Sequence, residues 1–270
     1  MFQDSHPRLS NRNNMLIMLF AHHDTSYFFD HSVKAILRKQ QLVNFESLWN
    51  SPADWIETPN QRRNGWSGVS RLDLQNNSDL AVFVKRQENH NTRTAAHPFR
   101  GIPTYRRELN SIALFHKANI PTLKPVYYGE RIEHGKHQAI LMTKALDDYQ
   151  DMFALQKTGS EQQVMQALEK LAQEVWHMHS QGLAHYCLYP NHVFVRFING
   201  QPKIRIIDLE KVRRDLLKTR MRLKDLDCYL RHSKSFTPEA RQHFVDSYMA
   251  TGKVAREQML RQRLQTRIHT

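Results

Sequence analysis

Short apolar runs separated by turn-forming residues extend from about residue 65 to residue 143 and predict β-strands. A loop carrying His97-Pro98 and Ile102-Pro103 precedes a helical period of apolar positions at residues 104–118, which Pro121 ends. The expected strands lie at residues 71–74, 80–84, 126–128 and 139–143, with turns at residues 76–78 and 134–135. This order predicts a small β-rich region that contains one helix.

Longer helical periods dominate the second half of the chain. The clearest helix spans residues 161–180, where apolar side chains recur at helical spacing and Gly182 follows the last turn. Strands at residues 193–197 and 203–207 flank Asn199-Gly200, a pair that tolerates the positive φ angles of a tight hairpin. Helices are expected again from residue 215 onward.

These elements predict an α+β fold in which a small β-rich N-lobe is followed by a mainly helical C-lobe. We expect the N-lobe at residues 46–143 and the C-lobe at residues 144–270, with a hinge at residues 144–150. Residues 1–45 are expected to be a poorly defined N-terminal extension, although residues 32–50 carry a weak helical pattern.

The composition is that of a folded protein with a sizeable core, since 40% of the 270 residues are hydrophobic and 24% are charged. The formal net charge of +13 is unevenly distributed, because residues 211–270 carry 15 Lys/Arg against 6 Asp/Glu, a net +9. Such a region is either a solvated basic face or a surface for phosphate-rich partners such as nucleotides, nucleic acid or an anionic membrane.

The cysteine content and the apolar runs indicate the cellular compartment in which the protein is expected. Cys187 and Cys228 are the two cysteines and offer no disulfide framework, which fits a reducing cytoplasm. The apolar run at residues 15–21 is much shorter than the roughly 20 residues of a membrane-spanning helix and lacks the setting of a signal peptide. We therefore expect a cytoplasmic protein whose contact with the inner membrane, where it occurs, is peripheral.

Three weak signals in the first half fit the binding of phosphate groups. Gly65 and Gly68 form a short glycine pair between strands, where backbone N–H groups can approach phosphate, although such a pair is more often a simple turn. Lys85 ends a buried strand, and Glu108 on the next helix can pair with its ammonium group. Taken alone, Lys85 is better explained as an exposed lysine at a strand end, and Glu108 alone is a weak signal that a surface glutamate would equally explain.

A fourth signal lies in the second half. The loop from His185 to His192 follows the long helix, and Asp208 stands at the end of a later apolar strand. A carboxylate at such a strand end, facing a loop with polar ligand types, is typical of a metal site. A buried aspartate that caps a turn is the structural alternative.

In chain order, these residues resemble the lipopolysaccharide-core (Kdo/heptose) kinase family, and most closely its InaA-like branch. The resemblance covers about residues 49–245, and its ordered set of motifs is specific although each motif is modest. The resembling stretches are residues 54–68, 83–86, 97–104 with Arg107-Glu108, 185–192, 208–211 and 224–227.

The resemblance implies a protein-kinase-like fold, ATP and Mg²⁺ as cofactors, and roles for single residues. Lys85 resembles the lysine on the α/β-phosphates and Glu108 its helix partner, with Gly65 and Gly68 also expected near ATP. Asp208 resembles the magnesium aspartate, and His192 occupies the position of the second metal ligand. In the same comparison the loop that begins at His185 resembles the catalytic loop, and Asp225 resembles the aspartate that braces it.

The chain departs from the kinase pattern at the catalytic base. Cys187 stands where a kinase has its base aspartate, and a free thiol with a pKa of about 8.5 is a poor substitute for a carboxylate. His192 stands where a kinase has asparagine, and imidazole suits softer metals than Mg²⁺. Only 17 residues separate Asp208 from Asp225, which leaves no room for a peptide platform and favours a small molecule or glycolipid as acceptor.

Two functions follow from these observations. The first is an ATP-dependent phosphotransferase that acts on the hydroxyl group of a small molecule or an anionic sugar or glycolipid, with Lys85, Glu108, Cys187, His192 and Asp208 at its catalytic centre. The alternative is a pseudokinase, a nucleotide-binding sensor or stress-response protein without useful turnover, motivated by Cys187. Both require Lys85 and Asp208 to act on the same triphosphate.

Two further classes are disfavoured by the sequence. A nucleic-acid binder would suit the net charge, but no recognisable motif or aromatic–basic platform occurs, and no specific nucleic-acid partner is expected. His177 and His179 lie at positions i and i+2 of a helix and point to different faces. Because no His-Glu-x-x-His or paired Cys-x-x-Cys pattern occurs either, the sequence does not predict a zinc site.

Overall fold

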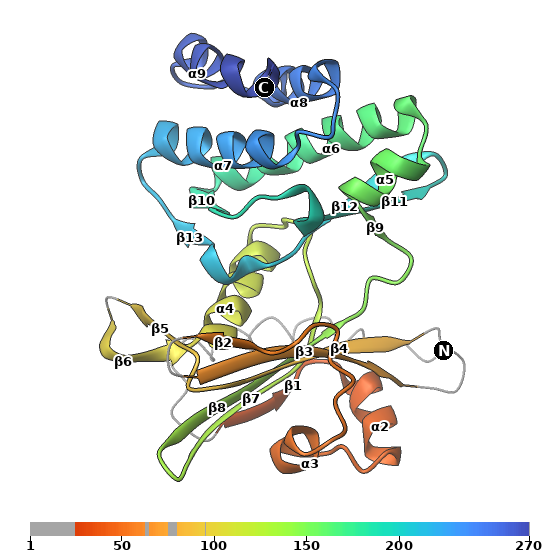
Figure 1. The fold of residues 1–270 in the computed structure, drawn as a ribbon, viewed down its shortest axis with the longest axis vertical. Coiled ribbons are helices and arrows are strands. Elements are labelled where there is room, and N and C mark those ends of the chain that lie inside the picture. The colour runs from red at the N-terminus through yellow and green to blue at the C-terminus, as the bar shows by residue number, and fades with distance from the viewer. Residues whose placement is uncertain (1–24, 63–64, 75–79, 95, 270) are drawn as a thin grey trace, which may run out of the picture. The chain divides into compact units, whose positions relative to one another are not determined.

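The computed structural model describes residues 25–62, 65–74, 80–94 and 96–269 (Figure 1). The chain divides into two compact units. The first unit comprises Met1–Ala113 with Lys124–Ala145, and the second comprises Leu114–Leu123 with Leu146–Thr270. No helix within the described ranges is long and apolar enough to cross a membrane.

A six-stranded antiparallel sheet forms the centre of the first unit, with the strand order β1-β7-β8-β4-β3-β2. Helices α2 (His31–Lys39) and α3 (Phe45–Trp49) lie between the first two strands in the chain, and α4 (Thr104–Lys117) follows a hairpin of β5 (Asn91–Thr94) and β6 (His97–Pro103). The strands are β1 (Thr25–Phe28), β2 (Asn60–Arg62), β3 (Gly65–Asp73), β4 (Ala81–Glu88), β7 (Pro125–Glu133) and β8 (Lys136–Lys144).

The alternation of side chains along β4 separates a packing face from a polar one. Val82 and Val84 enter the hydrophobic core, whereas Lys85, the next residue, points to the opposite face of the sheet and meets α4. The core that receives the two valines is built from α2, α3 and neighbouring strands and includes Val33, Leu37, Leu48, Tyr127, Ile140 and Met142.

Two expectations for the first unit were wrong in detail. Residues Thr25–Phe28, expected within a poorly defined extension, pair as β1 with β7, and residues His31–Lys39, where the sequence carries a weak helical pattern, form α2 and pack into the core. The loop expected at residues 97–103 is strand β6, which pairs with β5. Strands β1 and β6 have no strong alternating pattern of their own, so pairing with β7 and with β5 decides their structure. Residues 1–14 and the turn expected at residues 76–78 lie outside the described residues.

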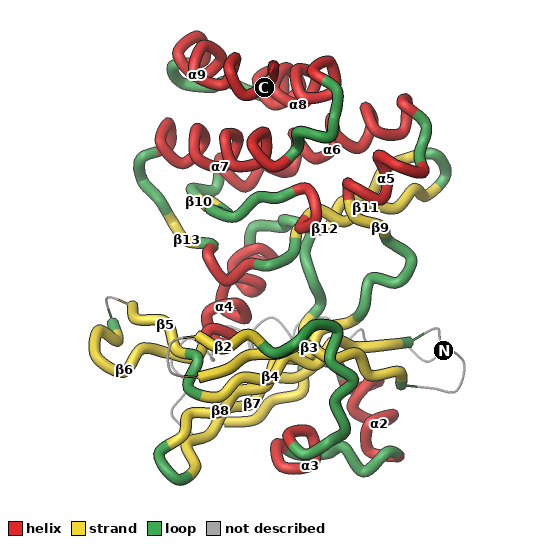
Figure 2. Tube along the Cα trace, in the orientation of Figure 1, coloured by secondary structure: helices red, strands yellow, loops and turns green. Residues whose placement is uncertain are grey.

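The second unit is mainly helical and contains a small three-stranded sheet (Figure 2). Its helices are α5 (Met152–Thr158), α6 (Glu161–Ser180), α7 (Lys218–His232), α8 (Pro238–Thr251) and α9 (Glu257–His269). Its strands are β9 (Gln150–Asp151), β10 (Leu183–Ala184), β11 (Val193–Ile198), β12 (Gln201–Ile206) and β13 (Arg213–Arg214). Helix α6 packs against α8 and against β12, and α7 packs against α9.

Helix α6 has the bounds that its apolar period predicts. Ser160 and Gln163 form a capping box at its start, and Gly182, with φ 71°, follows its end. Its apolar face is buried, with Leu171 and Val175 inaccessible to solvent. The helix is therefore specified locally at both ends as well as by burial.

The β11–β12 hairpin sets the position of the residues that follow and precede it. Asn199 and Gly200 take the positive φ angles of 51° and 73° that a two-residue turn requires. The resulting register pairs Val193 with Ile206. Because His192 precedes the first of these residues and Asp208 follows the second by two, the hairpin brings the two polar residues to the same end.

Candidate active site

Lys85 and Glu108 form a buried ion pair in the first unit. The ammonium nitrogen Nζ of Lys85 donates to Oε1 of Glu108 at 2.6 Å, and the two side chains are 17% and 3% exposed. The pair joins the central strand β4 to the first turns of α4. A lysine held in this way by a helix glutamate is the arrangement by which kinases aim a cation at phosphate groups.

Gln87, which no sequence motif names, positions this pair. Its side chain points to the same face of β4 as Lys85 and accepts a hydrogen bond from the N–H of Tyr105 at 2.9 Å. Its amide group donates to the carbonyl of His90 at 2.8 Å. Tyr105 lies in the first turn of α4, so Gln87 fixes the start of the helix one turn before Glu108. The sequence did contain a signal for Gln87: side chains alternate along a strand, so residues 85 and 87 of β4 lie on the same face.

Gly65 and Gly68 lie within strand β3 rather than around a turn, and the connection at residues 63–64 lies outside the described residues. A Cβ atom on Gly68 would lie 2.7 Å from the indole of Trp55, and one on Gly65 would lie 2.1 Å from the carbonyl oxygen of Glu88. Close packing therefore explains why both positions are glycine, and the phosphate role expected of them stays a prediction.

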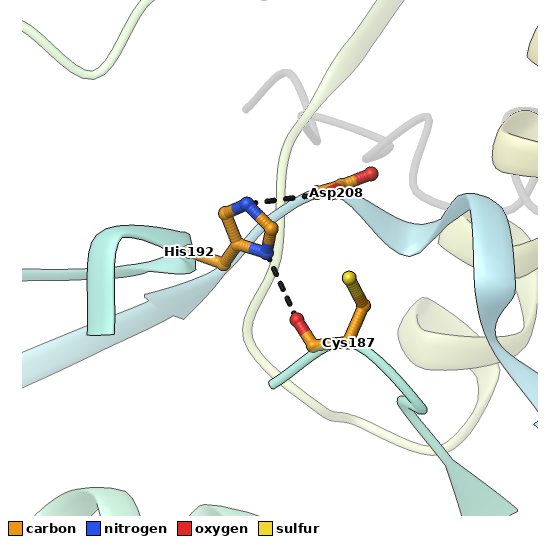
Figure 3. Close-up of side chains that lie close together, drawn as sticks. All are labelled: Cys187, His192 and Asp208. Atoms are coloured by element: carbon orange, nitrogen blue, oxygen red, sulfur yellow. Dashed lines mark hydrogen bonds and ion pairs between the residues drawn. The ribbon is translucent and has the colours of Figure 1, made fainter. Parts of the chain in front are cut away.

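The second unit brings Cys187, His192 and Asp208 together (Figure 3). His192 ends the short turn Pro190–His192, and its carbonyl accepts a hydrogen bond from the N–H of Ile207 at 2.9 Å. Asp208 follows Ile207 in the left-handed conformation, with φ 57°. An aspartate tolerates this conformation at a small cost, and such backbone strain is frequent at functional sites.

The three side chains offer one ligand atom each, and these atoms lie within 4.8 Å of one another. Nε2 of His192 is 3.4 Å from Oδ2 of Asp208, and Nδ1 of His192 donates to the carbonyl oxygen of Cys187 at 2.9 Å. Nζ of Lys211 is 3.5 Å from Sγ of Cys187. The Asp208 side chain is 36% exposed, so its carboxylate remains accessible.

Cys187 and His192 shift each other's pKa values. Burial opposes ionisation of Cys187, but hydrogen bonds from His192 and Tyr189 and the charge of Lys211 hold the pKa of the thiol below its usual value. Burial opposes protonation of His192, but Cys187 and Asp208 raise the pKa of its imidazole above its usual value. The thiol and the imidazole therefore each stabilise the charged form of the other.

Asp225 on α7 holds the preceding loop from behind. Its carboxylate is fully buried and accepts hydrogen bonds from the N–H groups of His185 and Tyr186, both at 2.7 Å. His179 on α6 contacts the same carboxylate at 3.1 Å and the hydroxyl of Tyr248 at 2.7 Å. Burial opposes ionisation of Asp225, but the bond from His179 and the nearby histidines hold the pKa of the carboxyl below its usual value.

His185 is also fully buried, and its Nε2 donates to the carbonyl oxygen of Ile207 at 2.9 Å. Burial lowers the pKa of this imidazole, so the neutral form is favoured. The bond ties the start of the loop to the residue before Asp208. His179 was recognised in sequence only as lying on the other face of α6 from His177; its contact with Asp225, 46 residues away, required the fold.

The expected site residues thus form two groups. Lys85 and Glu108 meet in the first unit, whereas Cys187, His192 and Asp208 meet in the second, with His185 and Asp225 supporting their loop. The first group can hold an anion through a positioned ammonium. The second group can hold a cation through a carboxylate, an imidazole and a thiol.

Comparison with known proteins places the chain in a family. The sequence profile of the lipopolysaccharide kinase (Kdo/WaaP) family matches residues 46–248. Protein InaA of Escherichia coli (strain K12) is 32% identical over 180 residues, which cover 64% of this chain and 80% of that protein. The structure of WaaP in complex with acyl carrier protein superimposes with a TM-score of 0.60 and 17% identity over 90% of this chain and 95% of that one. The protein-kinase-like fold expected from the sequence is confirmed.

Proposed function

The chain belongs to the lipopolysaccharide kinase (Kdo/WaaP) family, and from this membership we propose that it transfers the γ-phosphoryl group of ATP to a hydroxyl group of a sugar or glycolipid. The observation that carries the proposal is the 2.6 Å pair of Lys85 and Glu108. A buried glutamate that aims a lysine from the sheet is costly to maintain unless the cation has a task. Contact with the α- and β-phosphates is the task that the family supports.

Asp208 is the residue that we expect to bind Mg²⁺. Mg²⁺ is commonly held by one or two carboxylates, the phosphates of the substrate and water, so one accessible carboxylate is sufficient. The ion would neutralise charge on the phosphates during transfer. His192 and Cys187 are poor ligands for such a hard cation. In this proposal His192 instead contacts the acceptor hydroxyl or a phosphate oxygen.

Phosphoryl transfer joins the acceptor oxygen to the γ-phosphorus while the bond from this phosphorus to ADP breaks, and the acceptor proton leaves. The transition state is loose, so positioning and charge stabilisation contribute much of the rate. A base aspartate is therefore helpful rather than indispensable. His192 and the solvent are the available acceptors for the released proton.

The structure around Asp208 favours an acceptor other than a protein. Nine residues, 209–217, connect Asp208 to helix α7, and they contain a single short turn and the two-residue strand β13. A protein kinase uses a longer segment at this point to seat its peptide substrate. A small molecule or a glycolipid does not need such a seat.

A basic and apolar groove in the second unit suits an anionic amphiphile. The groove has a volume of about 550 Å³ and combines apolar side chains with four cations. Leu216 is 95% exposed and Leu217 60% exposed at its edge. Exposed apolar side chains among cations are typical of surfaces that contact anionic lipid headgroups. The groove is lined by Leu216, Leu217, Lys218, Thr219, Arg220, Leu223, Arg256, Met259 and Arg263.

We therefore propose a peripheral contact with an anionic membrane face, at the cytoplasmic side where ATP is available. An anionic sugar linked to lipid would be presented to the enzyme there. Lys218 and Arg220 would attract the headgroup, and Leu216 would enter the interfacial region. This contact explains why the excess of positive charge is concentrated after residue 211.

A second candidate function is nucleotide binding without turnover. The observation that favours it is the thiol of Cys187 at the position of the base, held beside His192 and Lys211. In this case the protein binds Mg·ATP through the same residues but acts as a sensor. The two candidates differ in turnover and agree in binding.

Thermal unfolding with Mg·ATP tests the shared part of both candidates. Saturating nucleotide should raise the Tm of the wild type by a few degrees, because a ligand that binds only the folded state stabilises it. Asp208→Ala should abolish the shift, whereas Asp246→Ala, at an exposed carboxylate of α8, should retain it. Equal shifts for wild type and Asp208→Ala would refute the metal–nucleotide role of Asp208.

Turnover separates the two candidates. ADP release in the presence of purified lipopolysaccharide, above the release without it, supports the phosphotransferase. Binding without turnover in the wild type, with turnover restored by Cys187→Asp, supports the sensor instead. Absence of both binding and turnover contradicts both.

A further inference from the structure

We propose that Cys187, His192 and Asp208 bind one thiophilic divalent cation, for which Zn²⁺ is the best match. The site would be occupied without nucleotide, so zinc binding goes beyond the phosphotransfer proposal and does not depend on it, whereas its effect on nucleotide binding rests on that proposal. The reason for the proposal is the chemistry of the donor set: a sulfur, a nitrogen and an oxygen converge at one point. Such a mixed set favours zinc over magnesium.

The distances fit coordination of a single ion. The three ligand atoms lie within 4.8 Å of one another, and Nε2 of His192 is 3.4 Å from Oδ2 of Asp208. Tetrahedral zinc has bonds of roughly 2.0–2.3 Å to such ligands, so neighbouring donor atoms are about 3–4 Å apart. Small rotations of the accessible Asp208 side chain suffice to close the set. Three protein ligands leave a fourth position for water, as in catalytic zinc sites.

The tautomer of His192 supplies a second argument. A carbonyl oxygen can only accept a hydrogen bond, so the 2.9 Å contact with the Cys187 carbonyl places a proton on Nδ1 of His192. In the neutral ring, Nε2 then presents a lone pair to the carboxylate of Asp208. A cation placed between Nε2 and this carboxylate would be ligated by both. An outer-shell bond from Nδ1 to a backbone carbonyl is also the usual way in which proteins orient a metal-ligating histidine.

The charges around Cys187 are consistent with a thiolate ligand. The ammonium of Lys211 is 3.5 Å from Sγ and stabilises a negative sulfur. The Lys211 residue is exposed, so its long side chain can move into solvent when a metal cation takes its place beside the thiolate. Tyr189 also contacts the thiol and would remain as an outer-shell neighbour.

Zinc at this site would regulate the binding of the nucleotide. Asp208 is the carboxylate that we assign to the Mg²⁺ of ATP, and it cannot serve both cations at full strength. Bound Zn²⁺ should therefore weaken the binding of Mg·ATP, and Mg·ATP should weaken the binding of Zn²⁺ by the same factor. The protein would then respond to the level of available zinc.

The test uses Zn²⁺ and its spectroscopic substitute Co²⁺ on the full chain without nucleotide. Wild type should bind one equivalent and show a thiolate-to-Co²⁺ charge-transfer absorption that added Zn²⁺ abolishes. Cys187→Ser should lose the absorption and weaken Zn²⁺ binding at least about 100-fold, the upper end of the cost of losing an outer-shell partner. Cys228→Ser is the matched control, since it removes the other cysteine, which lies outside the cluster, and should behave as wild type.

A measurement without variants covers the case in which Cys187→Ser fails to fold. One equivalent of Zn²⁺ should protect Cys187 of the wild type from iodoacetamide, as peptide mass spectrometry detects. Equal Zn²⁺ binding by the two serine variants, or no protection of Cys187, would overturn the proposal and leave a proton between His192 and Asp208. Zinc binding without any Mg·ATP shift would instead refute the nucleotide proposal and leave this one standing.

Discussion

Asp225 accepts a hydrogen bond at 2.7 Å from the main-chain N–H of Tyr186, a residue whose φ angle is 60°. A left-handed conformation at a tyrosine is unfavourable and persists only where its surroundings impose it. The buried carboxylate on α7 provides this constraint, together with the guanidinium of Arg213, which lies 4.0 Å from the centre of the Tyr186 ring. The shape of the loop that carries Cys187 therefore depends on a residue 39 positions away.

Removal of this carboxylate should be among the most damaging single changes in the second unit. Asp225→Ala leaves two buried N–H groups and His179 without their acceptor, so we expect the free energy of unfolding to fall by about 3–5 kcal/mol. Asp227→Ala, two residues further along α7, removes exposed pairs with Arg231 and Arg267 and should cost less than about 1 kcal/mol. Urea unfolding measures both, and similar losses would contradict the bracing role of Asp225.

Lys85 should matter for nucleotide binding more than any exposed lysine of the sheet. Lys85→Met removes the ammonium that Glu108 aims, and we expect the Kd for Mg·ATP to rise at least about tenfold, or 1.4 kcal/mol. Lys136→Met provides the control, since Lys136 is exposed and pairs with Glu88 at 3.1 Å. Titration calorimetry should show an unchanged Kd for the control. An unchanged Kd for Lys85→Met would remove Lys85 from the site.

The stability of the first unit should depend on Asp30 in a pH-dependent way. Its carboxylate accepts from the N–H groups of Ser32 and Val33 at 3.0 Å and pairs with Lys144 at 2.6 Å. Partial burial opposes ionisation, but Lys144 and the capping donors lower the pKa of Asp30 to about 2. Since the folded pKa is below the ordinary value of about 3.9, the stabilisation is complete above that pH and is lost as the pH falls towards 2.

Asp30→Ala should therefore lower the free energy of unfolding by about 1–2 kcal/mol at pH 7, the cost of losing a helix N-cap. The difference from wild type should shrink as the pH falls from about 4 to 2. Asp73→Ala, at the exposed end of β3, should change stability little at any pH. Denaturant unfolding across this pH range is the measurement, and a difference that grows on acidification would contradict the assigned pKa.

Alkylation at pH 8 should distinguish the two cysteines. Burial raises the pKa of the Cys228 thiol to about 11, so only about one molecule in a thousand carries a thiolate there. Metal-free wild type should therefore react with iodoacetamide at Cys187, and Cys187→Ser should be nearly inert until it is unfolded. Peptide mass spectrometry identifies the modified residue. Predominant labelling of Cys228 in the folded protein would contradict this assignment.

Membrane contact should depend on the exposed leucines at the groove. Replacing Leu216 and Leu217 together by serine removes apolar area worth about 1.5–3 kcal/mol for each fully buried leucine, so binding to vesicles rich in anionic lipid should fall at least about tenfold. Phe99→Ser is the control, because Phe99 is 87% exposed but belongs to the first unit. Vesicle sedimentation measures the bound fraction. Equal binding to neutral and anionic vesicles would contradict the electrostatic part of the proposal.

Local signals account for the elements that were predicted well. Helix α6 has both an apolar period and a capping box, and the β11–β12 hairpin contains Asn199-Gly200 at its turn. Strand β1 and the β5–β6 hairpin lack such signals. Strand β1 forms by pairing with β7, which lies far along the sequence, and β5 and β6 form by pairing with each other. Propensity is a weak guide at such positions, since pairing and burial decide the outcome.

The site residues likewise divide into those that a sequence motif identifies and those that only the fold reveals. Each of Lys85, Glu108, Cys187, His192 and Asp208 is named by a motif, and the family resemblance already implied one catalytic centre for the last three, but no linear spacing gives the distances between their ligand atoms. A search for zinc patterns in the sequence fails for this reason, because the ligands are spread over 22 positions and meet only through the hairpin register. Gln87 and His179 were missed because they act through backbone and side-chain contacts that a motif does not record.

The amino-acid sequence by itself determined most of the order of the helices and strands, the uneven charge and the family, since periodicity, turn chemistry and motif order are written along the chain. The tertiary structure alone decided which polar groups share a position, how Asp208 and Tyr186 are held in left-handed conformations, and which buried groups support them. The physical reason is that contacts across tens of residues depend on strand register and helix packing, and those arise from the summed burial of many side chains rather than from any local segment.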